Sequence, residues 1–148
     1  MIYIGIDPGQ KGGYSYIMDG VPKAFSWDDT FFVHDMRCLA SIKGEALVAA
    51  VEKVGARPGQ GTVSMFNFGK NAGYIEGVLS ALGIPYQLVP PVKWKKDFSL
   101  IGKDKQASIM TCRKLFPDMD LKRTERCRTD SDGKAEATLL AEYARRKF

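Results

Sequence analysis

The chain opens with Met1-Ile-Tyr-Ile-Gly-Ile-Asp-Pro-Gly-Gln-Lys-Gly-Gly13, a run of apolar strand formers that ends on a carboxylate. A nearly continuous apolar run of this length is typical of a strand that is covered on both faces of a sheet. Asp7 would then lie where the sheet meets solvent, and the glycines behind it would let a backbone or a phosphate come close. Asp-Pro-Gly is also a common turn signal, so this stretch alone does not distinguish a ligand from a turn.

Length and composition indicate one folded domain that spans residues 1–148, with 45% hydrophobic residues. No apolar run approaches the ~20 residues of a membrane span, and the chain starts in a strand without a signal-peptide pattern. Cys38, Cys112 and Cys127 lack CxxC spacing, and His34 is the single histidine, which disfavours a Cys/His zinc site. We therefore expect free thiols and a cytoplasmic protein, in the host cytoplasm if a phage encodes it.

The basic charge is concentrated in one segment. Residues 93–128 contain eleven Lys/Arg against five Asp/Glu, whereas the whole chain has a net charge of +5. Such a segment indicates a polyanionic partner, although a solvated basic face is the alternative. Trp94 and Phe98 stand among its lysines, a pattern that suits phosphate contact with aromatic support. The lysines concerned are Lys93, Lys95, Lys96, Lys103 and Lys105.

The remaining patterns predict an α/β fold with a mixed five-stranded sheet flanked by helices. Asp19-Gly20 is a strong hairpin signal, so the first three strands should form an antiparallel meander that parallel strands then extend. The strands after the first are expected over 14–18, 21–27, 47–54 and 84–89. Helices are expected over 35–42, 71–82, 104–116 and 131–146.

Two further sites in the sequence carry acids that need an explanation. Glu52 lies inside a valine-rich strand, where a carboxylate is costly unless it is paired, for example with a lysine, or binds a cation. Asp132 and Glu136 share one face of the last helix, where like charges are destabilising unless a divalent cation lies between them. Thr129-x-x-Asp132 also has capping-box spacing, which gives Asp132 a structural alternative, and Asp130 is a nearby rival.

These acids would meet if the first strand pairs with the fourth and the last helix packs on that sheet. Four adjacent carboxylates repel one another and raise one another's pKa, and hard divalent cations such as Mg²⁺ relieve the repulsion. Two such ions ~4 Å apart activate a water and stabilise the leaving oxygen in phosphodiester hydrolysis. The sequence has neither a GxSxG nucleophile motif nor a P-loop.

Residues 55–70 begin as a glycine-rich loop and end with Met65, Phe66 and Phe68. These apolar side chains are either core anchors or wedges that stack on unpaired bases. Three glycines then recur every four residues on one face of the expected helix, which indicates close approach of a strand beneath or of a second subunit. These are Gly69, Gly73 and Gly77.

Five segments together resemble the RuvC-type Holliday junction resolvases, with the closest likeness to the shorter phage and prophage versions. They are residues 4–9 with 12–13, 50–53, 64–69 with 73, 90–95 and 132–137. The resemblance implies a ribonuclease H-like fold, a homodimer, and nicking of branched DNA that depends on Mg²⁺, with Mn²⁺ as a possible substitute and two ions per site. Strands of like polarity would be cut symmetrically, leaving 5′-phosphate and 3′-hydroxyl ends.

The resemblance also implies roles for individual residues. Asp7 matches the first-strand metal ligand and Glu52 the second acid, while Asp132 and Glu136 match the acid pair of the last helix. This chain has Asp-x-x-x-Glu where the bacterial enzymes usually have Asp-x-x-Asp, so either Asp132 or Asp130 is the third ligand. The basic residue near the scissile phosphate corresponds to Lys105, with Lys93, Lys95 or Lys96 as companions, and the junction-stacking aromatic to Phe66 or Phe68.

Three other functions compete with junction resolution. A nuclease of the same fold that acts on flaps, forks or RNA–DNA hybrids is the strongest, because a fold does not choose a substrate. A catalytically inactive module that binds branched DNA is the second, although it would have no need of four acids. An ATP-binding fold of the actin and hexokinase type is the third, but such proteins need two domains around a cleft.

Overall fold

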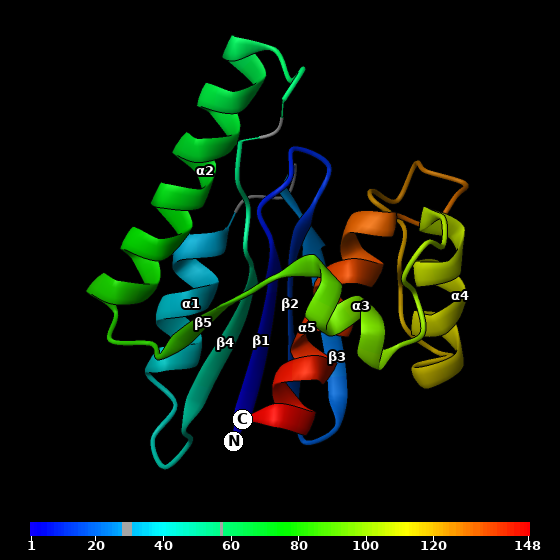
Figure 1. The fold of residues 1–148 in the computed structure, drawn as a ribbon. Coiled ribbons are helices and arrows are strands. Elements are labelled where there is room, and N and C mark those ends of the chain that lie inside the picture. Colours follow the sequence, from blue (N-terminus) through cyan, green and yellow to red (C-terminus); the bar gives the residue numbers. More distant parts are fainter. Residues whose placement is uncertain (28–30, 57) are drawn as a thin grey trace.

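The computed structural model describes residues 1–27, 31–56 and 58–148, which are organised around a five-stranded sheet in the order β3-β2-β1-β4-β5 (Figure 1). The first three strands form an antiparallel meander, and β4 and β5 continue the sheet parallel to β1. The mixed sheet expected from the sequence is confirmed. The strands are β1 Ile2–Asp7, β2 Gly13–Met18, β3 Val21–Ser26, β4 Leu47–Glu52 and β5 Tyr86–Val89.

The turn between β2 and β3 has the backbone conformation that its sequence predicts. Asp19 and Gly20 have φ angles of 52° and 79°, so both lie in the left-handed region. Two successive residues in this region form the tight turn whose twist matches that of a hairpin. The Asp19-Gly20 hairpin is therefore confirmed.

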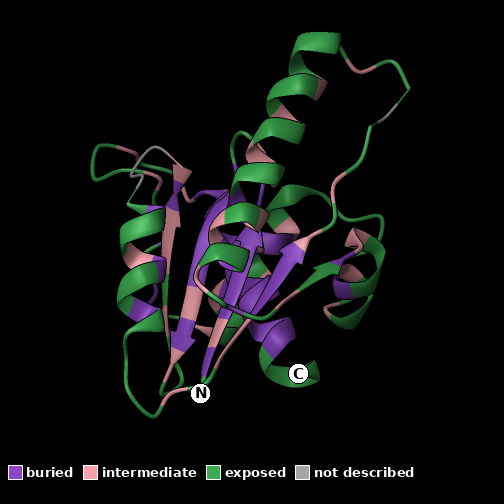
Figure 2. Cartoon of the chain, turned by 90° about the vertical axis from the view of Figure 1, so that its left-hand side faces the viewer, coloured by how far each residue is buried: buried purple, intermediate pink, exposed green. Residues whose placement is uncertain are grey.

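Helices cover both faces of the sheet (Figures 1 and 2). On one face α1 and α2 pack against the buried isoleucines of β1, namely Ile2, Ile4 and Ile6. On the other face α3, α4 and α5 share a second core with Ala50 and Val89. The helices are α1 Phe32–Ala40, α2 Thr62–Ala81, α3 Pro91–Asp97, α4 Lys105–Leu115 and α5 Asp132–Lys147.

The helix α5 lies against β1 with backbone on backbone. A Cβ atom at Gly5 would overlap the backbone of Ala137 and Ala141, and one at Gly133 would overlap the carbonyl of Lys11. Only glycine permits this approach at either position. The start of α5 is thereby fixed beside the end of β1 and the loop that follows it.

The start of α2 differs from the sequence-based expectation. It begins at Thr62, nine residues before the expected start at residue 71, after Gly61 in an extended conformation. The stretch 62–70 has one glycine and no proline, so a helix can run through it once the glycine-rich loop has ended. Met65, Phe66 and Phe68 therefore lie on a helix and not in a loop.

A short helix, α3, was not expected from the sequence. Pro91 follows the strand expected over 84–89 and occupies the first helical position, where its fixed φ suits the helix and its missing N–H is no loss. This helix directs its tryptophan inward, which matters for the site described below.

The outer face of α2 is bare. Ile75 and Leu79 are its buried residues, and Figure 2 shows a mostly exposed helix that rises beyond the sheet. A Cβ atom at each of the three regularly spaced glycines would meet nothing within 4 Å. The expectation that a strand lies beneath these glycines is therefore wrong, because no strand approaches them and two of them border an open cavity beside Val54. They are Gly69, Gly73 and Gly77.

Two simpler observations complete the description of the fold. All three cysteines are free thiols, of which Cys112 is buried. In the described ranges no helix has the length and apolar character that crossing a membrane requires.

Candidate active site

The carboxyl ends of β1 and β4 bring two acids to one edge of the sheet. Ile6 pairs with Val51 in parallel register, so Asp7 and Glu52 are the next residues on neighbouring strands. The last helix starts at Asp132 beside this edge. The four acids that were singled out in the sequence therefore come from three elements that meet at one place.

The electrostatics of Asp7 reflect this gathering. Its side chain is 9% exposed, and the pKa of its carboxyl is raised to about 7. Burial is the largest cause, followed by the charge of Glu52, and the charges of Glu136 and Asp132 add to it. The backbone N–H of Gly9, which donates to Asp7 Oδ1 at 2.9 Å, acts in the opposite direction. Asp7 thus lies in the combined field of the other three acids.

Glu52 is oriented by a tryptophan from the core. The indole Nε1–H of Trp94 donates to Glu52 Oε1 at 3.0 Å, and the Trp94 side chain is fully buried. The interpretation of Trp94 as aromatic support for phosphate contact is therefore wrong. The burial of Trp94 could not be seen in the sequence, because lysines flank it on both sides. On α3 these lysines point away from the core, whereas the tryptophan faces the sheet. Phe98 is also partly buried, against the same core.

Asp132 is held by a lysine and is not a capping residue. Lys105 Nζ lies 2.7 Å from Asp132 Oδ2, and this bond is the main reason why the pKa of Lys105 is raised. The N-cap of α5 is Ser131, whose hydroxyl accepts a hydrogen bond from the N–H of Lys134 at 3.3 Å. The expected capping box from Thr129 is therefore wrong, because the helix begins two residues later.

Glu136 receives contacts from two other helices. The hydroxyl of Ser108 on α4 donates to Glu136 Oε1 at 3.1 Å, and Lys95 Nζ of α3 lies 3.8 Å from the same oxygen. Lys95 is an expected phosphate contact that here borders the acids. Ser108 was missed from the sequence, where a serine inside an amphipathic helix carries no signal.

Asp130, the rival third ligand, is engaged elsewhere. Its two carboxylate oxygens accept hydrogen bonds from Arg113 Nε and Nη2 at 3.0 and 2.8 Å. A bidentate pair of this kind is among the stronger side-chain interactions and fixes geometry. Asp130 therefore ties the segment before α5 to α4, and it is not among the charges that raise the pKa of Asp7.

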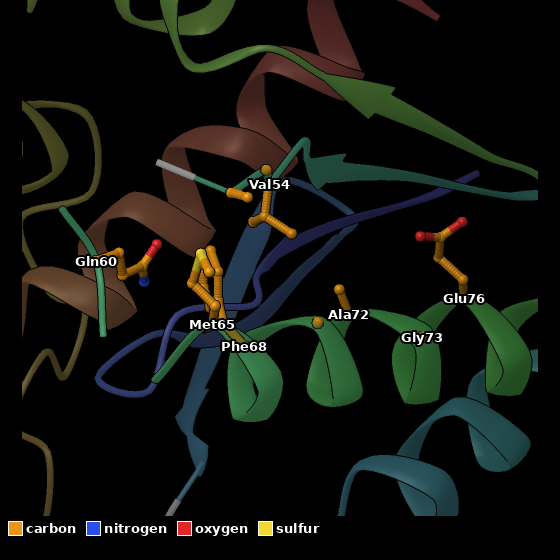
Figure 3. A pocket seen from close by; sticks show the side chains of 10 residues that line it. Val54, Gln60, Met65, Phe68, Ala72, Gly73 and Glu76 are labelled. Atoms are coloured by element: carbon orange, nitrogen blue, oxygen red, sulfur yellow. The ribbon is translucent and has the colours of Figure 1, made fainter. Parts of the chain in front are cut away.

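The expected DNA-contacting residues fall into two groups. Lys93, Lys96 and Lys103 are exposed on α3 and the segment after it. Phe66 is 69% exposed on α2. Phe68 is half-buried and, with Met65, lines a cavity of about 400 Å³ on the side of α2 that faces Val54 (Figure 3).

The four acids supply the oxygen ligands of a hard cation site, although their side chains do not point to one common position. In the part of the chain that the structure describes, no three Asp, Glu, His or Cys side chains are arranged to hold a metal ion as they stand. The acid oxygens instead contact Trp94, Ser108 and lysines. Mg²⁺ takes oxygen ligands, which these acids supply, and a cation would relieve the repulsion that helps to raise the pKa of Asp7. The residues therefore fit a divalent cation.

The raised pKa of Asp7 predicts how stability without metal depends on pH. The folded protein binds more protons than the unfolded chain between about pH 4 and 7, so ionised Asp7 lowers stability as the pH rises through this window. Asp7→Asn removes the charge and keeps the acceptor for Gly9. In EDTA we expect it to raise the free energy of unfolding by about 2–4 kcal/mol at pH 8 and by little at pH 4, from urea unfolding.

The exposed Asp118→Asn serves as the control, with no change expected at either pH. An equal effect of Asp7→Asn at pH 4 and pH 8 would contradict the electrostatic origin of the shift.

Comparisons with known proteins identify the fold. A scan against protein-family models and a search of curated proteins gave no match. Among solved structures, RuvC from Thermus thermophilus in complex with a Holliday junction substrate has a TM-score of 0.54 and 18% identity, covering 99% of this chain and 97% of that chain. A second Thermus thermophilus RuvC structure gives a TM-score of 0.53 and 20% identity, covering 99% and 96%. Neither supports the expected closer likeness to phage versions, but both show that this chain has the RuvC-like, ribonuclease H-like fold.

Proposed function

We propose that the protein is a metal-dependent, structure-selective endonuclease that resolves Holliday junctions by paired hydrolysis of phosphodiester bonds. The observation that carries this proposal is the position of Asp7 at the edge of the sheet, with its pKa raised to about 7 by burial and by three other acids. The likeness in fold to a RuvC protein solved with a Holliday junction substrate supports the class of substrate.

The four acids would hold the cations. Asp7, Glu52, Asp132 and Glu136 would bind two Mg²⁺ ions, or Mn²⁺ in their place. Asp132 is favoured over Asp130 because Arg113 already engages both oxygens of Asp130. When bound, such ions supply Lewis-acid activation of water and stabilise the leaving oxygen, which yields 5′-phosphate and 3′-hydroxyl ends.

The chain's own residues would prepare this site for a phosphate. Lys105 has a 70% exposed side chain, so it is free to leave Asp132 and to pair with the phosphate beside the scissile bond. Trp94 and Ser108 hold Glu52 and Glu136 in orientation. A Cβ atom at Gly12 would lie 2.7 Å from Asp7 Cγ, so a glycine there keeps the approach to Asp7 open.

The remaining contacts would guide branched DNA across the site. Lys93, Lys95, Lys96 and Lys103 offer positive charge along α3 and the segment after it, which suits backbone phosphates. Phe66 is favoured over Phe68 as the aromatic that stacks on unpaired bases, because Phe66 is exposed and Phe68 is half-buried. Flaps, forks and RNA–DNA hybrids are alternative substrates for the same four acids.

Symmetric cutting of two strands requires two active sites, whereas one chain carries one set of acids. We infer that a second copy of the chain lies against α2 at the spaced glycines, which no other part of the described chain covers and which allow a helix to approach closely. The same helix carries Val63, which is 74% exposed. A homodimer built on α2 would present two identical sites to one junction.

The proposed activity is tested by incubating the protein with labelled four-way junction, fork and linear duplex, in Mg²⁺ and in EDTA. We expect the junction to be cut in Mg²⁺ alone and in preference to linear duplex. Asp7→Asn should bind the junction but not cut it, because it removes a cation ligand without adding bulk, and Asp118→Asn should cut normally.

Linear duplex cut as fast as the junction would rule out structure selectivity, and a preference for forks would favour the alternative nuclease. Binding without cutting in every divalent metal would favour the inactive module. Cutting by Asp7→Asn would remove Asp7 from the site.

The homodimer is tested with Gly73→Gln, which places a side chain among the spaced glycines of α2. A Cβ atom at this position meets nothing within 4 Å and the substitution replaces a helical glycine, so the fold should gain up to about 1 kcal/mol. Light scattering at micromolar concentration should give a dimer for the wild type and a monomer for the variant. A monomeric wild type, or a variant that remains a dimer, would contradict the interface.

A further inference from the structure

A cavity lined mainly by cations lies in the connection between α4 and α5, apart from the four acids. Its volume is about 710 Å³. The segment that forms it runs back along the two helices and ends at the start of α5 (Figure 1). Four cations and two acids line it, so the cavity is positive on balance. They are Lys122, Arg123, Arg126 and Lys134, with Asp120 and Glu125.

Lys134 is the unusual member of this set. Its residue is 6% exposed because its stem is packed, whereas its ammonium is not a buried atom and lines the cavity. This ammonium has neither an ion pair nor a hydrogen bond to any residue that the structure describes. A lysine can bury its apolar stem while its charged end stays at a water-filled surface, and here that end lies in the cavity. The proposed nuclease chemistry gives this unpaired ammonium no role, and an anion in the cavity would pair with it.

The cavity and the four acids lie on different sides of the same helix. Lys134 is two residues from both Asp132 and Glu136, which is about 200° around the axis of an α-helix. Its side chain lines the cavity, whereas the two acids lie in the field of Asp7. The two sites therefore flank the first two turns of α5.

The walls of the cavity are fixed by hydrogen bonds. The backbone of Lys134 is held on both sides, since its N–H donates to Ser131 and its carbonyl accepts from Thr138 at 2.7 Å. The carbonyl of Arg123 accepts from the hydroxyl of Ser26 at 3.2 Å, which ties the loop to β3. The carboxylate of Asp120 accepts from the backbone N–H of Lys122 at 3.0 Å, so this acid is already engaged within the loop.

We propose that this cavity binds a phosphate group, with Lys134 at its base and Lys122 and Arg126 at its rim. The positive helix N-terminus beside Lys134 adds to the attraction for an anion. Resting on the proposed function, we assign the phosphate to the backbone of the bound DNA, away from the scissile bond. A strand held at both sites would be fixed across the start of α5, which would position the bond to be cut.

The binding of phosphate is tested with inorganic phosphate as the probe and the thermal unfolding midpoint as the readout, with chloride at matched ionic strength as the reference. Phosphate should raise the midpoint of the wild type and should not raise that of Lys134→Met, which keeps the volume and removes the charge. The double variant Lys122→Gln/Arg126→Gln changes exposed residues, so it keeps the test decisive if Lys134→Met does not fold. Lys43→Gln, in the turn before β4, should respond like the wild type.

An equal phosphate response in the wild type, Lys134→Met and the double variant would overturn the site. The source of the phosphate is tested by junction binding in EDTA at several salt concentrations. Loss of one phosphate contact should reduce the slope of log affinity against log salt by about 1 in Lys134→Met. An unchanged slope together with a lost phosphate response would overturn the assignment to DNA and leave a site for free phosphate.

The outcome for this cavity is separable from that for the proposed function. Neither the thermal measurement nor the binding measurement in EDTA requires cutting. A wild type that responds to phosphate but cuts no branched DNA would contradict the nuclease proposal and support the cavity as an anion site.

Discussion

The close contact between α5 and β1 is the constraint on which the rest of the structure depends. Glycine at residues 5 and 133 lets the helix backbone lie directly on the strand and on the loop after it. This contact brings the acids of α5 to the edge of the sheet where β1 and β4 end. Any larger residue at these two positions would push α5, and with it Asp132 and Glu136, away from Asp7.

Gathering these carboxylates has an energetic cost that the fold offsets only in part. The ammonium of Lys105, the indole of Trp94 and the hydroxyl of Ser108 each satisfy one acid oxygen. The pKa of Asp7 nevertheless stays raised to about 7, so repulsion and burial are not fully compensated within the chain. A cluster that lowers stability is expected where function requires it, and here a divalent cation would complete the compensation.

The sequence allowed the sheet and the acids to be predicted because their signals are local. An apolar run that ends on Asp7, a glutamate in a valine-rich strand and an Asp-Gly hairpin each indicate their structure within a few residues. The start of α2 could not be predicted as reliably, since a glycine-rich loop runs into a helix that itself contains glycines. The competition between Thr129 and Ser131 for the N-cap also depends on tertiary packing, because both residue types are good caps.

The inward or outward direction of side chains on the helices was the least predictable feature. The position of Trp94 among lysines favours a nucleic-acid contact. On α3, however, its side chain points into the core and donates a hydrogen bond to Glu52. Lys134 between two acids resembles a fully exposed residue, yet α5 leaves it 6% exposed, with its side chain lining a cavity between other cations. In both cases the packing of the helix on the sheet determines which way the side chain points, and the local sequence pattern does not indicate that packing.

The central claim is that four carboxylates form one cation site around a partly protonated Asp7. Isothermal titration of Mn²⁺ into the protein, in two buffers of different ionisation enthalpy, tests it most directly. Binding should release about half a proton at pH 7 and almost none at pH 9, since the cation requires ionised Asp7, and Glu52→Gln should weaken it. Binding without proton release at pH 7, or equally tight binding to Glu52→Gln, would contradict the account.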